Sequence, residues 1–168
     1  MKLNIGCGSS FEGDVRLDIK QTKSVTIIAD THFIPFKAES FSYVICTEVL
    51  EHLHSPLQAL EEICRVLNKN GKVFITVPNL TEIRRILSIS RPPLKFSNIP
   101  GRSNHKQGWD AIEFQRLAHQ AKLRVLKINW IDLYSRKGRR YNVLNPILKR
   151  ILPRSLFYLH MKIICKKE

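Results

Sequence analysis

Short apolar runs that end at a glycine or an acidic residue recur in the first third of the chain. They are residues 3–5 before the Gly6-Cys7-Gly8 turn, residues 15–17 before Asp18, and the β-branched run 25–29 before Asp30. Runs of this length and composition predict strands. Because open α/β sheets bind ligands at the carboxyl edge of their parallel strands, both aspartates are predicted to lie at one ligand-binding edge.

The middle of the chain alternates strand, helix and strand. Residues 41–46 predict a buried strand, and 72–77 predict another that Pro78 ends. Between them, apolar residues recur at helical spacing from Leu57 to Leu67. Ser55 is predicted to cap this helix, with Pro56 in its first turn and Gln58 completing a capping box. The helix is predicted to end in a glycine-terminated turn at 68–71.

The second half contains a long irregular stretch and a second helix. Residues 80–90 favour a short helix, 90–107 an irregular loop, and 145–152 a short basic helix. Asp110 and Glu113 begin a helix whose inward residues are predicted to be Ile112, Leu117, Ala118 and Ala121. Residues 123–133 and 158–165 predict the last two strands, and 136–140 a basic turn between them. Neither an internal repeat nor a second domain is indicated.

The glycine turn by itself fits two interpretations. Gly6 and Gly8 let a ligand approach the main chain, but a tight turn between two strands needs the same residues. No third glycine follows at the dinucleotide-binding spacing, and about ten residues separate Gly8 from Asp18 where such a site has about twenty. The pattern therefore excludes the usual dinucleotide fingerprint and leaves a different nucleotide-like ligand open.

Length and composition indicate an ordinary globular protein. The 168 residues fit a single domain spanning 1–168, with 43% hydrophobic and 25% charged residues. The four cysteines form no CxxC pair, so neither zinc site nor disulfide framework is predicted, and Cys46 and Cys64 are expected in the core. Neither a membrane span nor a signal peptide is recognisable, which predicts a cytoplasmic location.

Positive charge is concentrated in the second half of the chain. The net charge is +14; residues 1–80 hold 8 Lys/Arg against 9 Asp/Glu, and residues 81–168 hold 20 against 5. This asymmetry predicts an anionic partner such as a nucleic acid, a phospholipid headgroup or an acidic substrate. A solvated basic surface is the alternative. Phe96 and Trp109 are the sole aromatic residues among the basic ones of the loop, which weakens the interpretation as an RNA groove.

Several of these segments together resemble one family. They are Leu3 to Gly8, Asp18, Asp30 before Pro35-Phe36, Phe41 to Val44 leading into Glu48-Val49-Leu50-Glu51-His52, and Arg65-Val66-Leu67 before Gly71. In this order and spacing they resemble the class I S-adenosylmethionine-dependent methyltransferases, specifically the small methyltransferase domain 11 type. The resemblance implies an α/β fold: a Rossmann-like three-layer sandwich whose seven-stranded, mostly parallel sheet has its last strand antiparallel. The helix between the first two strands would be abbreviated.

The resemblance also implies a binding role for each matching residue. Gly6, Cys7 and Gly8 would wrap the methionine half of S-adenosylmethionine, Asp18 would hold the ribose hydroxyls, and Asp30 with Thr31 would contact the adenine. Thr47 and Glu48 would lie near the sulfonium. The complete set of expected cofactor-binding residues is Asn4, Gly6, Cys7, Gly8, Asp18, Ile19, Asp30, Thr31, Thr47 and Glu48. Family members usually carry an acid at the position of Asn4.

Three side chains are candidates for acid–base catalysis: Glu48, His52 and His105. Glu48, Glu51 and His52 are predicted to share a helical face, which leaves a divalent cation as a minor alternative to a site without metal. Trp109 either covers a substrate or anchors the loop.

The predicted activity is methyl transfer to a large or anionic acceptor, such as a glycan, a lipid-linked saccharide or another metabolite. RNA methylation and a non-catalytic, cofactor-binding or partner subunit are the alternatives. A partner chain or dimer is a candidate to roof the pocket.

Overall fold

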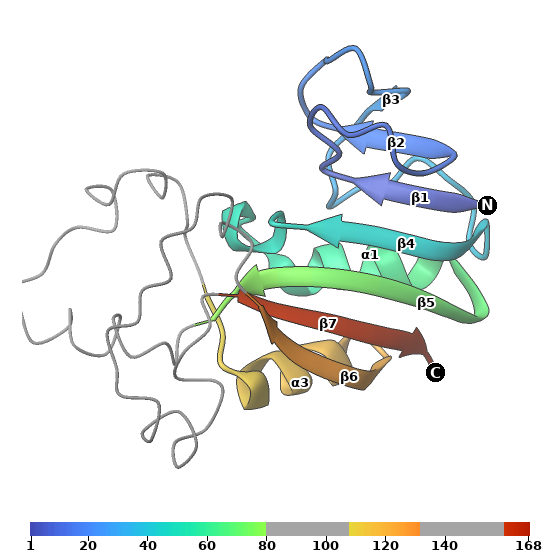
Figure 1. The fold of residues 1–168 in the computed structure, drawn as a ribbon. Coiled ribbons are helices and arrows are strands. Elements are labelled where there is room, and N and C mark those ends of the chain that lie inside the picture. The colour runs from blue at the N-terminus through green and yellow to red at the C-terminus, as the bar shows by residue number, and fades with distance from the viewer. Residues whose placement is uncertain (80–107, 132–159) are drawn as a thin grey trace, which may run out of the picture.

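The computed structural model describes residues 1–79, 108–131 and 160–168, which form one seven-stranded sheet with helices (Figure 1). The strands are β1 (Lys2–Ile5), β2 (Val15–Asp18), β3 (Ile27–Ile28), β4 (Phe41–Thr47), β5 (Leu67–Pro78), β6 (Leu123–Ile131) and β7 (His160–Lys167). The helical elements are the 3-10 turn η1 (Leu50–His52), α1 (Pro56–Val66) and α3 (Ala111–Gln120).

The strand order is β3-β2-β1-β4-β5-β7-β6. Strands β1 to β5 pair in parallel, and β7 runs antiparallel to both β5 and β6. The Rossmann-like sheet with an antiparallel last strand is therefore confirmed. The connection of residues 6–14 between β1 and β2 contains turns and bends but no helix. Strand β3 is shorter than the apolar run 25–29 that predicted it.

Two layers of side chains on one sheet face form the core. One row across the sheet is Leu3, Val44, Val73, Cys165 and Val125, and the next is Ile5, Cys46, Ile75, Ile163 and Ile128. Most of these residues are fully buried because α1 and α3 pack side by side against this face. In Figure 1, α1 lies behind the sheet. The described residues place no helix on the opposite face.

Helix α1 occupies the predicted segment, but both of its ends differ from the prediction. Pro56 stands in the first turn, yet the side chain of Ser55 makes no capping hydrogen bond, so the expected capping box is absent. The helix ends at Val66, because Leu67 is already extended and begins β5. The turn predicted to end the helix lies within β5, where Asn70 takes the left-handed conformation (φ 65°).

Helix α3 begins as predicted. The Asp110 carboxylate accepts from the backbone N–H groups of Ile112 and Glu113 at 2.8 Å each, and Glu113 completes the capping box. The prediction of Ile112 as an inward residue was wrong, since its side chain is 63% exposed. Phe114 is fully buried instead, one turn into the helix. Ala118 and Ala121 are buried as predicted.

The predicted helices at 80–90 and 145–152, the irregular loop at 90–107 and the basic turn at 136–140 lie outside the described residues. In the part of the chain that the structure describes, no helix combines the length and the apolar character that crossing a bilayer requires.

Candidate functional site

The glycine turn lies at the carboxyl edge of β1. Gly6 and Gly8 both adopt left-handed backbone angles (φ 63° and 53°), and the Gly6 N–H donates to the Leu17 carbonyl at 2.8 Å. A Cβ atom on Gly6 would collide with the Val49 side chain, whereas one on Gly8 would meet nothing within 4 Å. The turn therefore needs glycine at position 6 for space, and at position 8 for backbone conformation alone.

Asp18 holds this turn in shape from the end of the neighbouring strand. Its Oδ2 accepts from the Gly8 N–H at 2.9 Å, and its Oδ1 accepts from the Lys20 N–H at 2.9 Å. The residue is half-buried. Because each carboxylate oxygen can accept more than one hydrogen bond, Asp18 keeps acceptor capacity for the hydroxyls of a ligand.

The Gly8 carbonyl is fixed as well. It accepts from the hydroxyls of Thr22 at 2.6 Å and Ser24 at 2.7 Å. Next to it, Cys7 is buried, and burial together with the nearby Asp18 charge raises the pKa of its thiol. A thiol with a raised pKa is a poor nucleophile at neutral pH, so Cys7 serves this turn as a small packed side chain.

Asn4 and Ile19 lie beside the turn in different environments. Asn4 is 3% exposed, and its Nδ2 donates to the Glu12 carbonyl at 3.0 Å, which braces the connection 6–14 against β1. Ile19 is 67% exposed and follows Asp18 directly. Asn4 thus braces the connection that follows the glycine turn, and Ile19 offers an accessible apolar surface beside Asp18.

The second predicted acid, Asp30, follows β3 by two residues. Its Oδ1 accepts from the His32 N–H at 2.9 Å and lies 2.7 Å from His32 Nδ1. The backbone N–H of His32 is the main reason that the pKa of Asp30 lies below its ordinary value. Asp30 is half-exposed and charged at neutral pH, while the adjacent Thr31 is buried.

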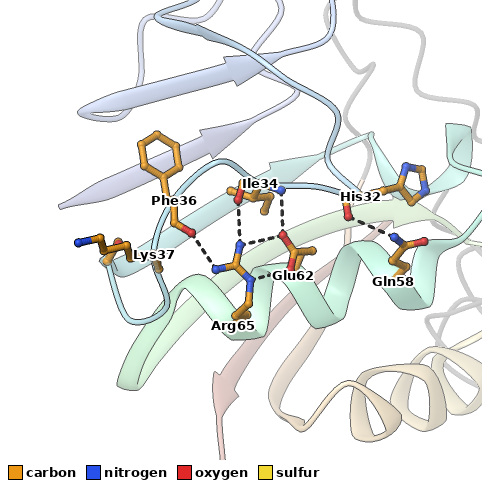
Figure 2. Close-up of polar contacts among 8 residues, drawn as sticks. His32, Ile34, Phe36, Lys37, Gln58, Glu62 and Arg65 are labelled. Atoms are coloured by element: carbon orange, nitrogen blue, oxygen red, sulfur yellow. Dashed lines mark hydrogen bonds and ion pairs between the residues drawn. The ribbon is translucent and has the colours of Figure 1, made fainter.

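A guanidinium clamp from α1 fixes the segment that follows Asp30 (Figure 2). Arg65 donates to the carbonyls of Ile34 (2.8 Å) and Phe36 (2.7 Å) and forms a bidentate pair with Glu62 (2.6 and 2.8 Å). Glu62 in turn accepts from the Ile34 N–H at 2.8 Å, and Gln58 Nε2 donates to the His32 carbonyl at 3.3 Å. The clamp holds residues 32–36, which follow Asp30 and Thr31 directly, on the helix.

Glu48 follows β4 directly and holds a strained backbone conformation. Its φ is 54°, uncommon for a residue with a side chain. Its N–H donates to the Thr76 carbonyl at 3.1 Å, and its Oε1 accepts from the Thr76 hydroxyl at 3.0 Å. Its Oε2 lies 3.2 Å from Nε2 of His160, the first residue of β7. Strain at a sheet edge where ligands bind is typical of functional residues.

Burial and hydrogen bonding shift the pKa of Glu48 in opposite directions. Burial by itself would raise the pKa of this carboxyl group, but contact with His160 and the Thr76 hydroxyl outweighs it, so the pKa of Glu48 is lowered. Neighbouring Glu51 is fully buried, and burial followed by repulsion from Glu48 raises its pKa to about 8. At neutral pH the pair therefore holds one negative charge, located on Glu48.

The predicted common helical face of Glu48, Glu51 and His52 was wrong. Glu48 precedes η1 with a left-handed backbone, Glu51 is buried and His52 is exposed, because η1 is a 3-10 turn of three residues. No cluster of three His, Cys, Asp or Glu side chains suited to a metal ion occurs among residues 1–79, 108–131 and 160–168. His105, the third acid–base candidate, lies outside these ranges.

Sequence reasoning missed His160. It is 2% exposed and pairs with Pro78 at the end of β5, which brings it to the carboxyl edge. The sequence held part of the information needed to find it. The first residue of an antiparallel strand lies beside the last residue of the strand it pairs with, so the start of the last strand was to be expected at this edge. Trp109 is buried and packs edge-to-face on Phe114 at 6.1 Å, so it anchors the start of α3.

The sequence matches one family, described as "Methyltransferase domain", over residues 12–75. The chain is 32% identical over 85 residues to the mitochondrial ubiquinone biosynthesis O-methyltransferase of Homo sapiens, covering 49% of this chain and 21% of that protein. Other curated relatives include uncharacterized proteins of Methanocaldococcus jannaschii. The matched part spans 21% to 39% of the length of these relatives.

Solved structures share the fold over nearly the whole chain. A SAM-dependent methyltransferase of Thermotoga maritima superposes with a TM-score of 0.71 at 12% identity, covering 99% of this chain and 82% of that one. A methyltransferase of Haloferax volcanii, solved in complex with the Trm112 methyltransferase activator, superposes with a TM-score of 0.64 at 15% identity, covering 98% and 80%. The fold of this chain is the one that these structures share.

Proposed function

We propose that this chain, a class I S-adenosylmethionine-dependent methyltransferase domain, transfers the cofactor's methyl group to a nucleophile on a large or anionic acceptor. The observation that carries the proposal is the bond from the Gly8 N–H to Asp18 Oδ2. It joins the glycine turn and the acid at one sheet edge, where this fold binds ligands.

The residues at this edge fit the cofactor. A Cβ on Gly8 would meet no protein atom within 4 Å, so the backbone there is open and would face the methionine portion. Asp18 has acceptor capacity for two ribose hydroxyls, and the Asp30–Thr31 edge, just before the segment that Arg65 holds, would border the adenine. When bound, S-adenosylmethionine supplies an electrophilic methyl carbon on a cationic sulfonium. The carboxylate of Glu48 would stabilise positive charge there, since opposite charges attract strongly away from bulk water.

The same edge holds the groups that would manage the acceptor's proton. Glu48 and His160 contact each other in a site that is largely closed to solvent. An acceptor oxygen or nitrogen that attacks the methyl carbon loses a proton, which the Glu48–His160 pair would receive. Much of the acceleration would come from holding the acceptor in line with the methyl group. His52 and His105 remain secondary proposals for this role.

The acceptor class is proposed from charge. With a net charge of +14 and most of its Lys and Arg after residue 80, the chain favours an acidic glycan, a lipid-linked saccharide or another anionic metabolite. RNA is the alternative acceptor, and its signature would be binding that weakens steeply with salt. A non-catalytic subunit is the third reading. The Haloferax methyltransferase was solved with an activator partner, which supports a partner chain for this domain as well.

Two measurements test the proposal. Isothermal titration calorimetry with S-adenosylmethionine and S-adenosylhomocysteine should show saturable binding to the wild-type chain. Methyl-labelled cofactor incubated with a metabolite extract, and separately with RNA, should label one class of acceptor. Absence of heat and of thermal stabilisation at saturating cofactor would overturn the proposal. Binding without transfer to any acceptor would instead favour the non-catalytic subunit.

A further inference from the structure

The sheet has a second face whose side chains lie opposite the helices. On it, one row across the strands is basic: Lys2, Tyr43, Lys72, Lys166 and Arg124. The next row is mainly apolar: Asn4, Ile45, Phe74, Ile164 and Lys127. We call these two rows the lysine face. Figure 1 views the sheet from this side, and no helix among residues 1–79, 108–131 and 160–168 covers it.

A hollow of about 510 Å³ lies on the lysine face. It is lined by Ile45, Phe74 and Ile164, by Lys2 and Lys162, and also by Glu12, which pairs with Lys2 at 3.6 Å. The ammonium of Lys2 lies 5.5 Å from the centre of the Tyr43 ring, and that of Lys162 lies 4.9 Å from the centre of the Phe74 ring. Apolar side chains framed by cations form a surface for an apolar ligand with negative charge at its borders.

Parallel strands are normally covered on both faces, because their side chains are apolar on both. The apolar row of the lysine face also needs a cover. Ile45 is only 5% exposed, but Phe74 and Ile164 are partly exposed. A polypeptide helix is the element that usually covers such a row. The basic row beside it then selects a helix with acidic residues flanking its apolar stripe.

Charge argues against two other occupants, and the exposed side chains argue against a third. A second copy of this chain carries +14 and would be repelled. Residues 80–107 hold 6 Lys/Arg and one acid, and residues 132–159 hold 7 and one, so neither segment complements a lysine-rich surface. RNA would match the charge, but Ile45 and Ile164 offer no ring for base stacking and lysines already lie over both aromatic rings.

We propose that the lysine face is a docking site for an acidic amphipathic helix of a partner protein, seated on Phe74 and Ile164 and flanked by Lys72 and Lys166. The docking residues on β5 and β7 are none of those proposed to bind the cofactor, although the hollow beside them extends to Asn4, Cys7 and Thr47 of that site. The proposal therefore does not depend on methyl transfer.

The test uses the full chain and a fluorescent synthetic helix of about 15 residues with a leucine stripe flanked by glutamates. Fluorescence anisotropy should give a dissociation constant on the order of 10 μM, as expected for a small interface. Lys72→Glu with Lys166→Glu should weaken binding about tenfold or more, since two attractions become repulsions. Phe74→Ala should weaken it by a similar factor. The matched control, Lys37→Glu with Arg116→Glu, makes the same charge change on exposed residues elsewhere and should leave binding unchanged.

Circular dichroism establishes that each variant is folded, and lysine acetylation read by mass spectrometry locates the peptide. Lys72, Lys162 and Lys166 should react in the chain alone and become protected by the peptide. Protection without peptide would mean that the chain covers its own face, which overturns the proposal. The proposal would also be overturned if the control pair weakened binding equally, or if the acidic helix did not bind at all. Tighter binding of a uridine oligonucleotide, abolished by the Lys72→Glu and Lys166→Glu change, would overturn it as well.

Discussion

Glu48 Oε2 and His160 Nε2 lie 3.2 Å apart although the two residues stand 112 positions apart in the chain. The contact exists because β7 runs antiparallel and begins where β4 and β5 end. Thr76 fixes the other carboxylate oxygen of Glu48. The carboxylate is therefore held at the carboxyl edge of the sheet by groups from two other strands.

Replacing His160 tests this pair. His160→Gln keeps a hydrogen-bonding side chain but removes the imidazole base, and we expect kcat to fall about 100-fold for an acceptor that must lose a proton. S-adenosylmethionine affinity should change little. Steady-state kinetics with the acceptor found by labelling measures both. The control is His54→Gln, which should leave kcat intact; an unaltered kcat for His160→Gln would exclude its role in proton transfer.

The raised pKa of Glu51 predicts that the stability of the fold depends on pH. Its pKa rises from an ordinary 4.5 to about 8 in the folded chain. Between these values the folded state holds a proton that the unfolded state has lost, so this contribution to stability is complete below about 4.5 and is lost as the pH rises through about 8. Glu51→Gln should therefore raise the free energy of unfolding by roughly 2–4 kcal/mol at pH 8 and by little at pH 4.5.

Urea unfolding at the two pH values measures this difference. Glu61→Gln, on the surface of α1, is the control and should show no such pH dependence. If Glu51→Gln destabilises the chain equally at both pH values, the carboxyl group is not held neutral by its surroundings.

Asp18→Asn tests the predicted ribose contact. The amide keeps the size of the side chain but loses charge and half of its acceptor capacity, so cofactor affinity should drop about 10- to 100-fold. Calorimetric titration with S-adenosylhomocysteine gives the dissociation constant. Asp14→Asn makes the same change on an exposed residue that bonds to the Lys2 N–H. Equal affinities for the two variants would remove Asp18 from the binding site.

The two glycines of the turn should respond differently to alanine. Gly8→Ala adds only the cost of a left-handed backbone, about 1 kcal/mol. Gly6→Ala adds the same cost and also a collision with Val49, so it should cost roughly 1–3 kcal/mol more and weaken cofactor binding. Thermal unfolding of both variants measures the difference. Equal losses would mean that the space beside Gly6 adapts to a methyl group.

Arg65→Lys tests the clamp in Figure 2. Lysine cannot make the bidentate pair with Glu62 and also reach the carbonyls of Ile34 and Phe36, so about 1–3 kcal/mol of stability should be lost. Proteolysis should speed up within residues 30–40. Arg116→Lys on the exposed face of α3 is the control. A resistant 30–40 segment in Arg65→Lys would show that other contacts hold it.

Local patterns in the sequence determined most of the sheet. Neighbouring residues are enough to recognise the apolar run before Gly6, the acid after each early strand and the apolar periodicity of α1. This is so because the periods of strands and helices are local properties. The capping residues of α3 were equally visible, since Asp110 and Glu113 stand three apart.

Tertiary structure alone decided which groups meet across strands. His160 reaches Glu48 through the register of β5 and β7, and Ile112 faces solvent because α3 turns Phe114 toward the core. The left-handed backbone at Glu48 removes it from the helical face that the spacing suggested. Spacing along the chain specifies neighbours within an element, whereas register between strands depends on how whole elements pack, which no short stretch encodes.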